Sequence, residues 1–263
     1  GWTATTCPEE YGGLGMSYLE LVVIAEELGR ACAPVPFSST VYLAAEAIMA
    51  LGTEAQKQAW LPKFADGTAI GCFAMGEAGG RVTPDQMSTR MQDGVLNGTK
   101  VPVADGGIAS VAIVVCASDK GDGASLALVD LSQDAVSKDS VQMIDFSRGH
   151  TELVFDGACA ETLGEEGAGW TAVESLMNTA AVLFAWEQIG IADKALEQAR
   201  EYALGRFAFG RSIASYQAIK HKLAKMYVKN TLARSNAYYG AWALNAKASD
   251  LVVASATSRV PAI

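Results

Sequence analysis

Hydrophobic residues recur at helical spacing in the first part of the chain, and polar residues that can cap a helix precede them. Ser17 and Glu20 have the spacing of a capping box ahead of an apolar helical stretch, which Gly29 is expected to end. Thr53 and Gln56 repeat this spacing ahead of a second apolar stretch. The beginning of the chain is therefore predicted to be helical.

Longer helical repeats return in the last part of the chain. One apolar face runs from Ala180 to Leu196, and a second pattern runs from Ile219 to Leu232. Gly205 and Gly210 bracket the end of the first repeat, where a helix commonly needs a residue that tolerates a positive φ. These features predict two helices joined by a turn.

Between the helical parts, the apolar residues form short runs that are typical of strands. The runs are Ile70–Met75, Gly94–Asn97, Val111–Cys116, Leu126–Leu131 and Glu152–Phe155. Clusters of glycine and aspartate, such as Lys120–Gly123, separate them. This pattern predicts an antiparallel sheet or a small barrel.

Helices, then strands, then helices make an α+β arrangement. We expect an N-terminal helical domain over residues 1–68, a β domain over residues 69–163 and a C-terminal helical bundle over residues 164–263. Neither an internal repeat nor a low-complexity segment interrupts this order.

Composition narrows the possible functions only slightly. Half of the 263 residues are hydrophobic, which is typical of a globular protein. The formal net charge of −9 argues against a nucleic-acid-binding surface. No apolar run has the length that a membrane span needs, so we expect none.

The cysteines and histidines argue against a metal site. The five cysteines are scattered and form no Cys-x-x-Cys pair, which favours reduced thiols and a cytoplasmic location over a disulfide framework or a zinc site. Only two histidines are present, His150 and His221, so a multi-histidine metal site is not expected.

The turn between the two C-terminal helices carries candidate binding chemistry. Arg206 can meet a phosphate or a carboxylate through two hydrogen bonds. Gln217 can read the edge of a base or cap the second helix. From these residues alone, a helical hairpin with a surface arginine remains the alternative.

The order of motifs along the chain resembles the acyl-CoA dehydrogenase family. The turn between the helices contributes Arg206, Phe209-Gly210, Gln217 and His221-Lys-Leu-Ala. Other motifs follow the family order elsewhere: Pro8-Glu-Glu-Tyr-Gly-Gly-Leu-Gly15, Glu26-Glu-Leu-Gly-Arg30, Leu96-Asn-Gly-Thr-Lys100 and Val154-Phe-Asp-Gly157. Each motif alone is weak, but their ordered combination covers nearly the whole chain.

This resemblance implies an FAD-dependent α,β-desaturation of an acyl-CoA thioester. It implies that FAD lies between the strand domain and the C-terminal helices and reaches a neighbouring subunit. Arg206 matches the arginine that meets the pyrophosphate, Phe209 an aromatic packed near the cofactor, and Gln217 the glutamine near the adenine. A solvated arginine, a core phenylalanine and a helix-surface glutamine remain the alternative.

The strand-domain half of the implied FAD site departs from the family pattern. Phe73 and Glu77 match the family aromatic and glutamate, but Gly76 stands where the family has threonine. Pro102 replaces a tryptophan expected beside the flavin ring, and Ala104 replaces a hydroxyl. Phe73, Gly76 and Ala104 remain candidate cofactor-binding positions, with flavin binding weakened by the lost hydroxyls and aromatic wall.

The resemblance leaves the catalytic base without a match in this sequence. The family places a glutamate either at the position of Ala180, which is followed by another alanine, or at a position beyond Ile263. A carboxylate suits this role because desolvation can raise its pKa toward neutrality. Glu187, about two turns after Ala180, can be recruited instead, although a structural role fits it better.

The turn Ser147-Arg-Gly-His150 precedes a predicted strand. Its Arg148 can meet a phosphate of CoA, and a solvated turn is the alternative.

The resemblance also implies partners. It predicts an acyl-CoA substrate from fatty acid or steroid side-chain catabolism, an electron-transfer acceptor protein, and assembly as a homo- or hetero-oligomer, either a dimer or a tetramer. It further predicts that helices belong before Gly1 and after Ile263, so that both helical domains are incomplete. A non-catalytic partner subunit that donates Arg206 and Gln217 to a neighbour's FAD site is the alternative, and a flavin monooxygenase is a third.

Overall fold

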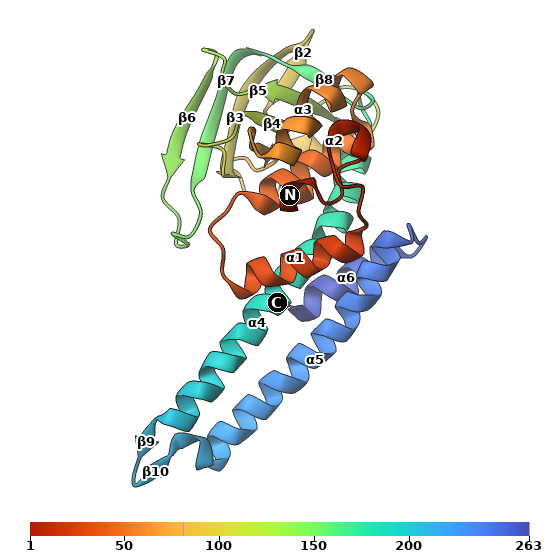
Figure 1. Ribbon diagram of the computed structural model, residues 1–263. Helices are drawn as coiled ribbons and strands as arrows, with labels where there is room; N and C mark the ends of the chain where they lie inside the picture. Colours follow the sequence, from red (N-terminus) through yellow and green to blue (C-terminus); the bar gives the residue numbers. More distant parts are fainter. Residues whose placement is uncertain (81, 263) are drawn as a thin grey trace. The chain divides into compact units, whose positions relative to one another are not determined.

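The computed structural model describes residues 1–80 and 82–262 and confirms the α+β fold class, with helices at both ends of the chain and strands in the middle (Figure 1). The chain forms two compact units. The strand unit comprises Gly1–Met16 and Pro34–Met177, and the helical unit comprises Ser17–Ala33 and Asn178–Ile263. The division into three domains at residues 68 and 163 stays a prediction.

The strand unit contains an 8-stranded sheet. Its strands are β1 (Gly71–Ala74), β2 (Arg90–Gln92), β3 (Val95–Ala104), β4 (Val111–Ala117), β5 (Ala124–Asp130), β6 (Val136–Val141), β7 (His150–Cys159) and β8 (Glu161–Leu163). The sequence pattern did not predict β2, β6 or β8. All six positions of β6 are at least partly exposed, so this strand lacks the apolar run that would reveal it.

The strand order is β6-β7-β3-β2-β4-β5-β8, and β1 pairs with β4 off this path. The pairs β2–β3, β3–β7, β4–β5, β5–β8 and β6–β7 are antiparallel, as expected. The pairs β1–β4 and β2–β4 are parallel, which the antiparallel prediction did not foresee. A parallel pairing is possible for β1 because a long stretch of chain separates it from β4.

The core of the strand unit lies on both faces of β4, every residue of which is buried. Alternate residues, such as Val111 and Ile113, join a cluster with side chains of the nearby helices. The intervening residues, such as Val114, join a second cluster with Leu153 and Phe155 of β7. A strand that is covered on both faces has a continuous apolar sequence, and this is why β4 could be predicted from the sequence.

The helical segments of the strand unit precede and flank the sheet. They are the 3₁₀ turns Trp2–Ala4, Glu9–Tyr11 and Pro84–Gln86, the π-helix Ser38–Ala45, and the α-helices α2 (Glu46–Leu51) and α3 (Glu54–Asp66). Thr53 caps α3 in the predicted capping box with Gln56. Side chains of α2 and α3 belong to the first core cluster. The two helices lie against one face of the sheet (Figure 1).

The helical unit contains α1 (Tyr18–Arg30), α5 (Gln217–Asn245), α6 (Leu251–Ala262) and most of α4 (Gly169–Gly205), which begins in the strand unit. A small hairpin of β9 (Phe207–Ala208) and β10 (Arg211–Ser212), followed by the 3₁₀ turn Ile213–Ser215, connects α4 to α5 (Figure 1). No helix among the described residues combines the length and apolarity that a bilayer crossing requires.

The predicted start of α1 is correct, and the helix ends at Arg30, directly after the Gly29 that was expected to end it. Ser17 and Glu20 form the expected capping box. Gly29, however, lies inside α1, where a Cβ would stand 1.9 Å from the carbonyl oxygen of Glu187 in α4. Gly190 makes the reciprocal contact, since its Cβ would lie 2.0 Å from the carbonyl oxygen of Glu26. Glycine is needed here for close helix packing instead of helix termination.

Candidate functional site

A buried ion pair organises the segment that follows β1. Lys100 of β3 is fully buried, and its Nζ donates to Glu77 Oε1 at 2.7 Å and to the Met75 carbonyl oxygen at 3.2 Å. The Glu77 carboxylate also accepts hydrogen bonds from the Ser88 backbone and hydroxyl groups and from the Thr89 backbone, at 2.8, 2.7 and 3.1 Å. Glu77 is therefore a structural anchor that joins three segments of the strand unit.

These contacts set the charge state of Glu77. Burial by itself raises the pKa of the carboxyl, but the hydrogen bonds from Lys100, Ser88 and Thr89 outweigh burial and lower the pKa to about 2. Burial lowers the pKa of Lys100, and the bond to Glu77 opposes that change. The carboxylate therefore stays ionised well below neutral pH and does not act as a proton acceptor near pH 7.

The candidate position Gly76 lies against β3. Its carbonyl oxygen accepts a hydrogen bond from the Val101 backbone at 2.9 Å, and a Cβ at residue 76 would stand 2.9 Å from the Val101 carbonyl oxygen. A threonine hydroxyl therefore has no room at this position. The expected lack of a hydroxyl thus has a structural reason in the close approach of two backbones.

The other candidate positions of this half-site lie on the two flanking strands. Phe73 is half-buried in β1, and Ala104 is the half-buried last residue of β3. Pro102 is exposed and follows Val101 through a cis peptide bond. The hydrogen bond between Gly76 and Val101 brings the segment after β1 against β3, while the cofactor-binding role of Phe73, Gly76 and Ala104 stays a prediction.

Unpaired backbone donors follow Gly76 in the chain. Within the described residues, the backbone N–H groups of Glu77 and Ala78 have no acceptor. The Thr83 hydroxyl oxygen is buried and likewise has no hydrogen-bond partner there. Unpaired donors and a buried hydroxyl need a ligand or water. They therefore fit a cofactor ring that carries carbonyl groups.

The second set of candidate residues lies in the helical unit, on the connection from α4 to α5. Arg206 is exposed, its backbone is held by Tyr202 and Ile213, and its side chain has no hydrogen bond or ion pair within the described residues. Phe209 is 98% exposed with a φ of +52°, so the alternative of a core phenylalanine is wrong. The hairpin thus presents a free cation and an aromatic ring to its surroundings.

Gln217 is the exposed first residue of α5. The preceding Tyr216 is the N-cap, and no side chain caps the helix, so the capping role proposed for Gln217 is wrong. The Tyr216 hydroxyl instead donates to the Ala208 carbonyl oxygen at 2.9 Å and ties the hairpin to the helix. Gln217 therefore remains available for a ligand.

No described residue is identified as the catalytic base. Ala180 is 1% exposed, has no proton-accepting group and packs in the helical core. The backbone of Glu187 lies against Gly29, and this half-buried residue makes a further interaction within the structure. The structural role favoured for Glu187 agrees with this position.

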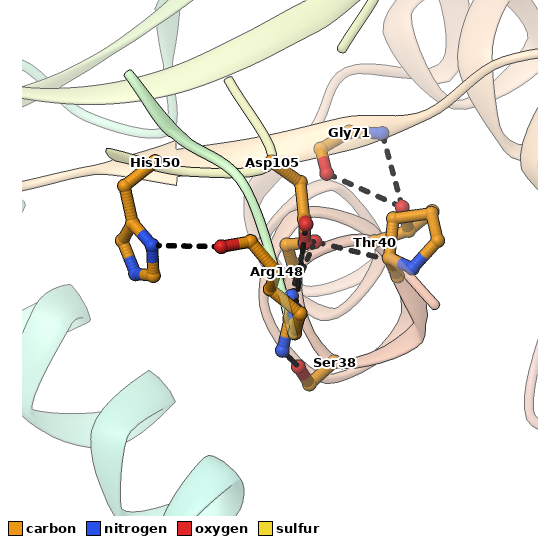
Figure 2. Close-up of polar contacts among 8 residues, drawn as sticks. Ser38, Thr40, Gly71, Asp105, Arg148 and His150 are labelled. Atoms are coloured by element: carbon orange, nitrogen blue, oxygen red, sulfur yellow. Dashed lines mark hydrogen bonds and ion pairs between the residues drawn. The ribbon is translucent and has the colours of Figure 1, made fainter. Parts of the chain in front are cut away.

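The Arg148 guanidinium is not free in solvent, because it is hydrogen-bonded inside the strand unit (Figure 2), and its contact with a phosphate of CoA stays a prediction. It pairs with Asp105 and donates to the Ser38 hydroxyl at 2.6 Å and to the Ser39 hydroxyl at 3.3 Å. The Ser39 hydroxyl also donates to Asp105. The network joins the π-helix Ser38–Ala45 to the sheet. No sequence motif that we recognised indicates these contacts.

Metal and thiol chemistry find no support in the part of the chain that the structure describes. No group of histidine, cysteine, aspartate and glutamate residues there can hold a metal ion. Burial raises the pKa of Cys72 to about 12 and that of Cys116 to about 11, so these thiols stay protonated. All five cysteines are free.

Two domain models of one family match the two helical parts of the chain. The model of the acyl-CoA dehydrogenase N-terminal domain matches residues 1–68, and that of the acyl-CoA dehydrogenase C-terminal domain matches residues 167–259. An acyl-CoA dehydrogenase of Bacillus subtilis is 32% identical over 89% of this chain, and a short-chain specific acyl-CoA dehydrogenase of Megasphaera elsdenii is 32% identical over 92%.

Two solved structures cover 100% of this chain at 28% identity. They are butyryl-CoA dehydrogenase from Megasphaera elsdenii, with a TM-score of 0.90, and a chain from the structure of the electron transferring flavoprotein of Acidaminococcus fermentans, with a TM-score of 0.89. This chain covers 73% and 72% of those chains. It spans 65% of the Bacillus relative, 68% of the Megasphaera relative and 58% of the human short-chain specific enzyme.

Proposed function

The chain belongs to the acyl-CoA dehydrogenase family, and from this premise we propose that it is part of a flavoprotein that desaturates an acyl-CoA thioester between Cα and Cβ. The observation that carries the proposal is the α4–α5 connection. Arg206, Phe209 and Gln217 are all exposed there, in the family order and without side-chain partners within the described residues. The relatives are named as dehydrogenases or a reductase, which does not favour a non-catalytic partner subunit.

The described residues fit FAD in two separate halves. In the helical unit, the free guanidinium of Arg206 suits the pyrophosphate and the amide of Gln217 suits the adenine. In the strand unit, the N–H groups of Glu77 and Ala78 suit the carbonyl-bearing flavin ring. When bound, FAD supplies the acceptor for the hydride that leaves Cβ of the substrate.

The proton at Cα needs a separate acceptor. Residue 180 is an alanine and contributes none. Glu77 is too weak a base, because its hydrogen bonds, including that from Lys100, lower the pKa of its carboxyl to about 2. A base beyond Ile263 stays a prediction.

The proposal includes assembly and an electron acceptor. We propose a homo- or hetero-oligomer in which Arg206 and Gln217 serve the FAD site of a neighbouring subunit. A solved chain with a TM-score of 0.89 comes from a structure of an electron transferring flavoprotein, and this supports a protein electron acceptor. A cytoplasmic location is part of the same proposal.

FAD uptake by the purified chain tests the proposal directly. The visible absorbance bands of the flavin ring are followed during titration with FAD, and butyryl-CoA is then added without oxygen. We expect a bound yellow species that butyryl-CoA or another acyl-CoA bleaches. A well-folded protein that takes up no FAD contradicts flavin binding, and a bound flavin that no acyl-CoA bleaches contradicts desaturation by this chain.

A further inference from the structure

The backbone from Met75 to Ala78 is fixed at its carbonyl groups and unpaired at its N–H groups. Lys100 Nζ binds the Met75 carbonyl oxygen at 3.2 Å, and the Val101 N–H binds that of Gly76 at 2.9 Å. The Glu77 side chain holds the end of the same stretch through Lys100. The N–H groups of Glu77 and Ala78 remain without an acceptor within the described residues.

We propose that Glu77 and Lys100 are positioning residues that hold this stretch so that the N–H groups of Glu77 and Ala78 bind a carbonyl group of the flavin ring. These amides donate the hydrogen bonds to the flavin ring that a hydroxyl at residue 76 would otherwise donate. The inference rests on the proposed function, because it assumes that the strand unit meets a flavin.

The energetics of the pair support a role in geometry. Full burial of a lysine carries a large desolvation cost, and apolar residues of similar volume usually serve stability as well or better. This pair instead directs one cation onto two acceptors, the Met75 carbonyl oxygen and the Glu77 carboxylate. It thereby fixes the position of a backbone segment, which an apolar pair cannot do.

The contact of Gly76 with β3 explains why backbone donors are needed. A side chain at residue 76 would meet the Val101 carbonyl oxygen at 2.9 Å from its Cβ, so a hydroxyl-bearing residue is excluded from this backbone arrangement. Residue 76 can therefore offer a ligand only its main-chain groups, and the N–H groups of the next two residues are free within the described residues. Main-chain donors are useful only when the segment is rigid, which the Glu77–Lys100 pair ensures.

The test compares Glu77→Gln with Arg148→Met in the full chain. Arg148→Met is the matched control, because it also removes a buried ion pair from the strand unit but touches a different segment. FAD affinity is measured by titration at a temperature where each variant is fully folded, together with the flavin absorbance spectrum. Hydrogen exchange of the backbone around residues 75–89 is followed without FAD.

For Glu77→Gln we expect FAD affinity to fall roughly tenfold or more, which is the loss of about one hydrogen bond. We also expect an altered flavin spectrum and faster amide exchange confined to residues 75–89. Arg148→Met should keep its FAD affinity within about twofold despite its lower stability. Lys100→Met should repeat the effect of Glu77→Gln, which provides a second variant if one of them fails to fold.

The outcomes separate this inference from the proposed function. A wild-type chain that binds FAD while Glu77→Gln binds it equally well overturns the positioning role alone. An equal loss of affinity in Arg148→Met also overturns it, because the effect is then one of general stability. A folded wild-type chain that takes up no FAD overturns the proposed function and the positioning role together.

Discussion

Arg234 of α5 donates two hydrogen bonds to the carboxylate of Glu26 in α1, at 3.0 and 2.7 Å, inside the helical unit. The same guanidinium donates to Asp193 of α4 at 2.5 Å and lies over the Trp186 ring. One cation therefore joins three helices. Its contacts with Glu26 raise its pKa further, so it stays charged at all accessible pH values.

We expect Arg234→Met to lower the free energy of unfolding by about 2 kcal/mol, because it leaves two carboxylates close together and half-buried. Arg234→Lys should recover only part of the loss, since an ammonium cannot form the paired contact with Glu26. Denaturant unfolding measures both. Arg200→Met, at an exposed position of α4, is the control and should change stability by less than about 0.5 kcal/mol. Equal effects at residues 200 and 234 would contradict the structure.

The contact between α1 and α4 predicts a strong effect of a single methyl group. Gly190→Ala should destabilise the helical unit by about 2 kcal/mol or more, because its Cβ would lie 2.0 Å from the Glu26 carbonyl oxygen. Gly205→Ala in the same helix has no atom within 4 Å of its Cβ and should be neutral or slightly stabilising. Thermal unfolding of the two variants tests this contact between α1 and α4, and similar melting temperatures would refute the close packing.

The Glu77–Lys100 pair predicts an acid-sensitive stability. The pKa of Glu77 is about 2 in the folded chain and near 4.5 when unfolded, so its contribution is fully present above the unfolded value and is lost as the pH falls from about 4.5 toward 2. The contribution is about 3 kcal/mol. Unfolding free energies measured through this pH window should fall for the wild-type chain. Glu77→Gln should be less stable near neutral pH and show a flatter profile, and identical profiles would rule out this role.

A threonine hydroxyl introduced at residue 76, next to the candidate flavin site, is not expected to improve FAD binding. Gly76→Thr should lower stability by about 1–3 kcal/mol and should not improve FAD binding, because its Cβ meets the Val101 carbonyl oxygen. Gly79→Ala, with no atom within 4 Å of its Cβ, is the control three residues further along and should be nearly neutral. Thermal unfolding and FAD titration test both variants. Tighter FAD binding by a stable Gly76→Thr chain would show that the segment moves to admit the side chain.

The sequence predicted the parts of the fold that depend on local pattern. The capping boxes at Ser17 and Thr53 are confirmed because a cap needs only residues close together in the chain. The buried β4 was located because its apolar run is continuous. Gly29 was misread since its role depends on Glu187, which no local pattern brings next to it.

The same distinction applies to the candidate site. Arg206, Phe209 and Gln217 follow one another on a single connection, so their order was visible in the sequence, and the structure adds that all three are exposed. The Glu77–Lys100 pair and the tie between Arg148 and Asp105 join distant segments. Only the folded chain reveals them, which is why Arg148 was expected at a ligand or in solvent.

Arg206 carries the last prediction, because its guanidinium is the free cation of the proposed pyrophosphate contact. Arg206→Met should weaken FAD binding roughly tenfold or more, the effect of losing a charge-assisted contact, and Arg206→Lys should weaken it less. Arg211→Met is the control on the same hairpin. The Arg211 guanidinium lies 4.0 Å from the Tyr216 ring centroid and is therefore already engaged, so its loss should affect FAD affinity less. Titrations at two salt concentrations add a second check, since only the wild-type contact should weaken clearly with salt. An Arg206→Met chain with unchanged FAD affinity would remove the pyrophosphate role, and with it the observation on which the proposed function depends.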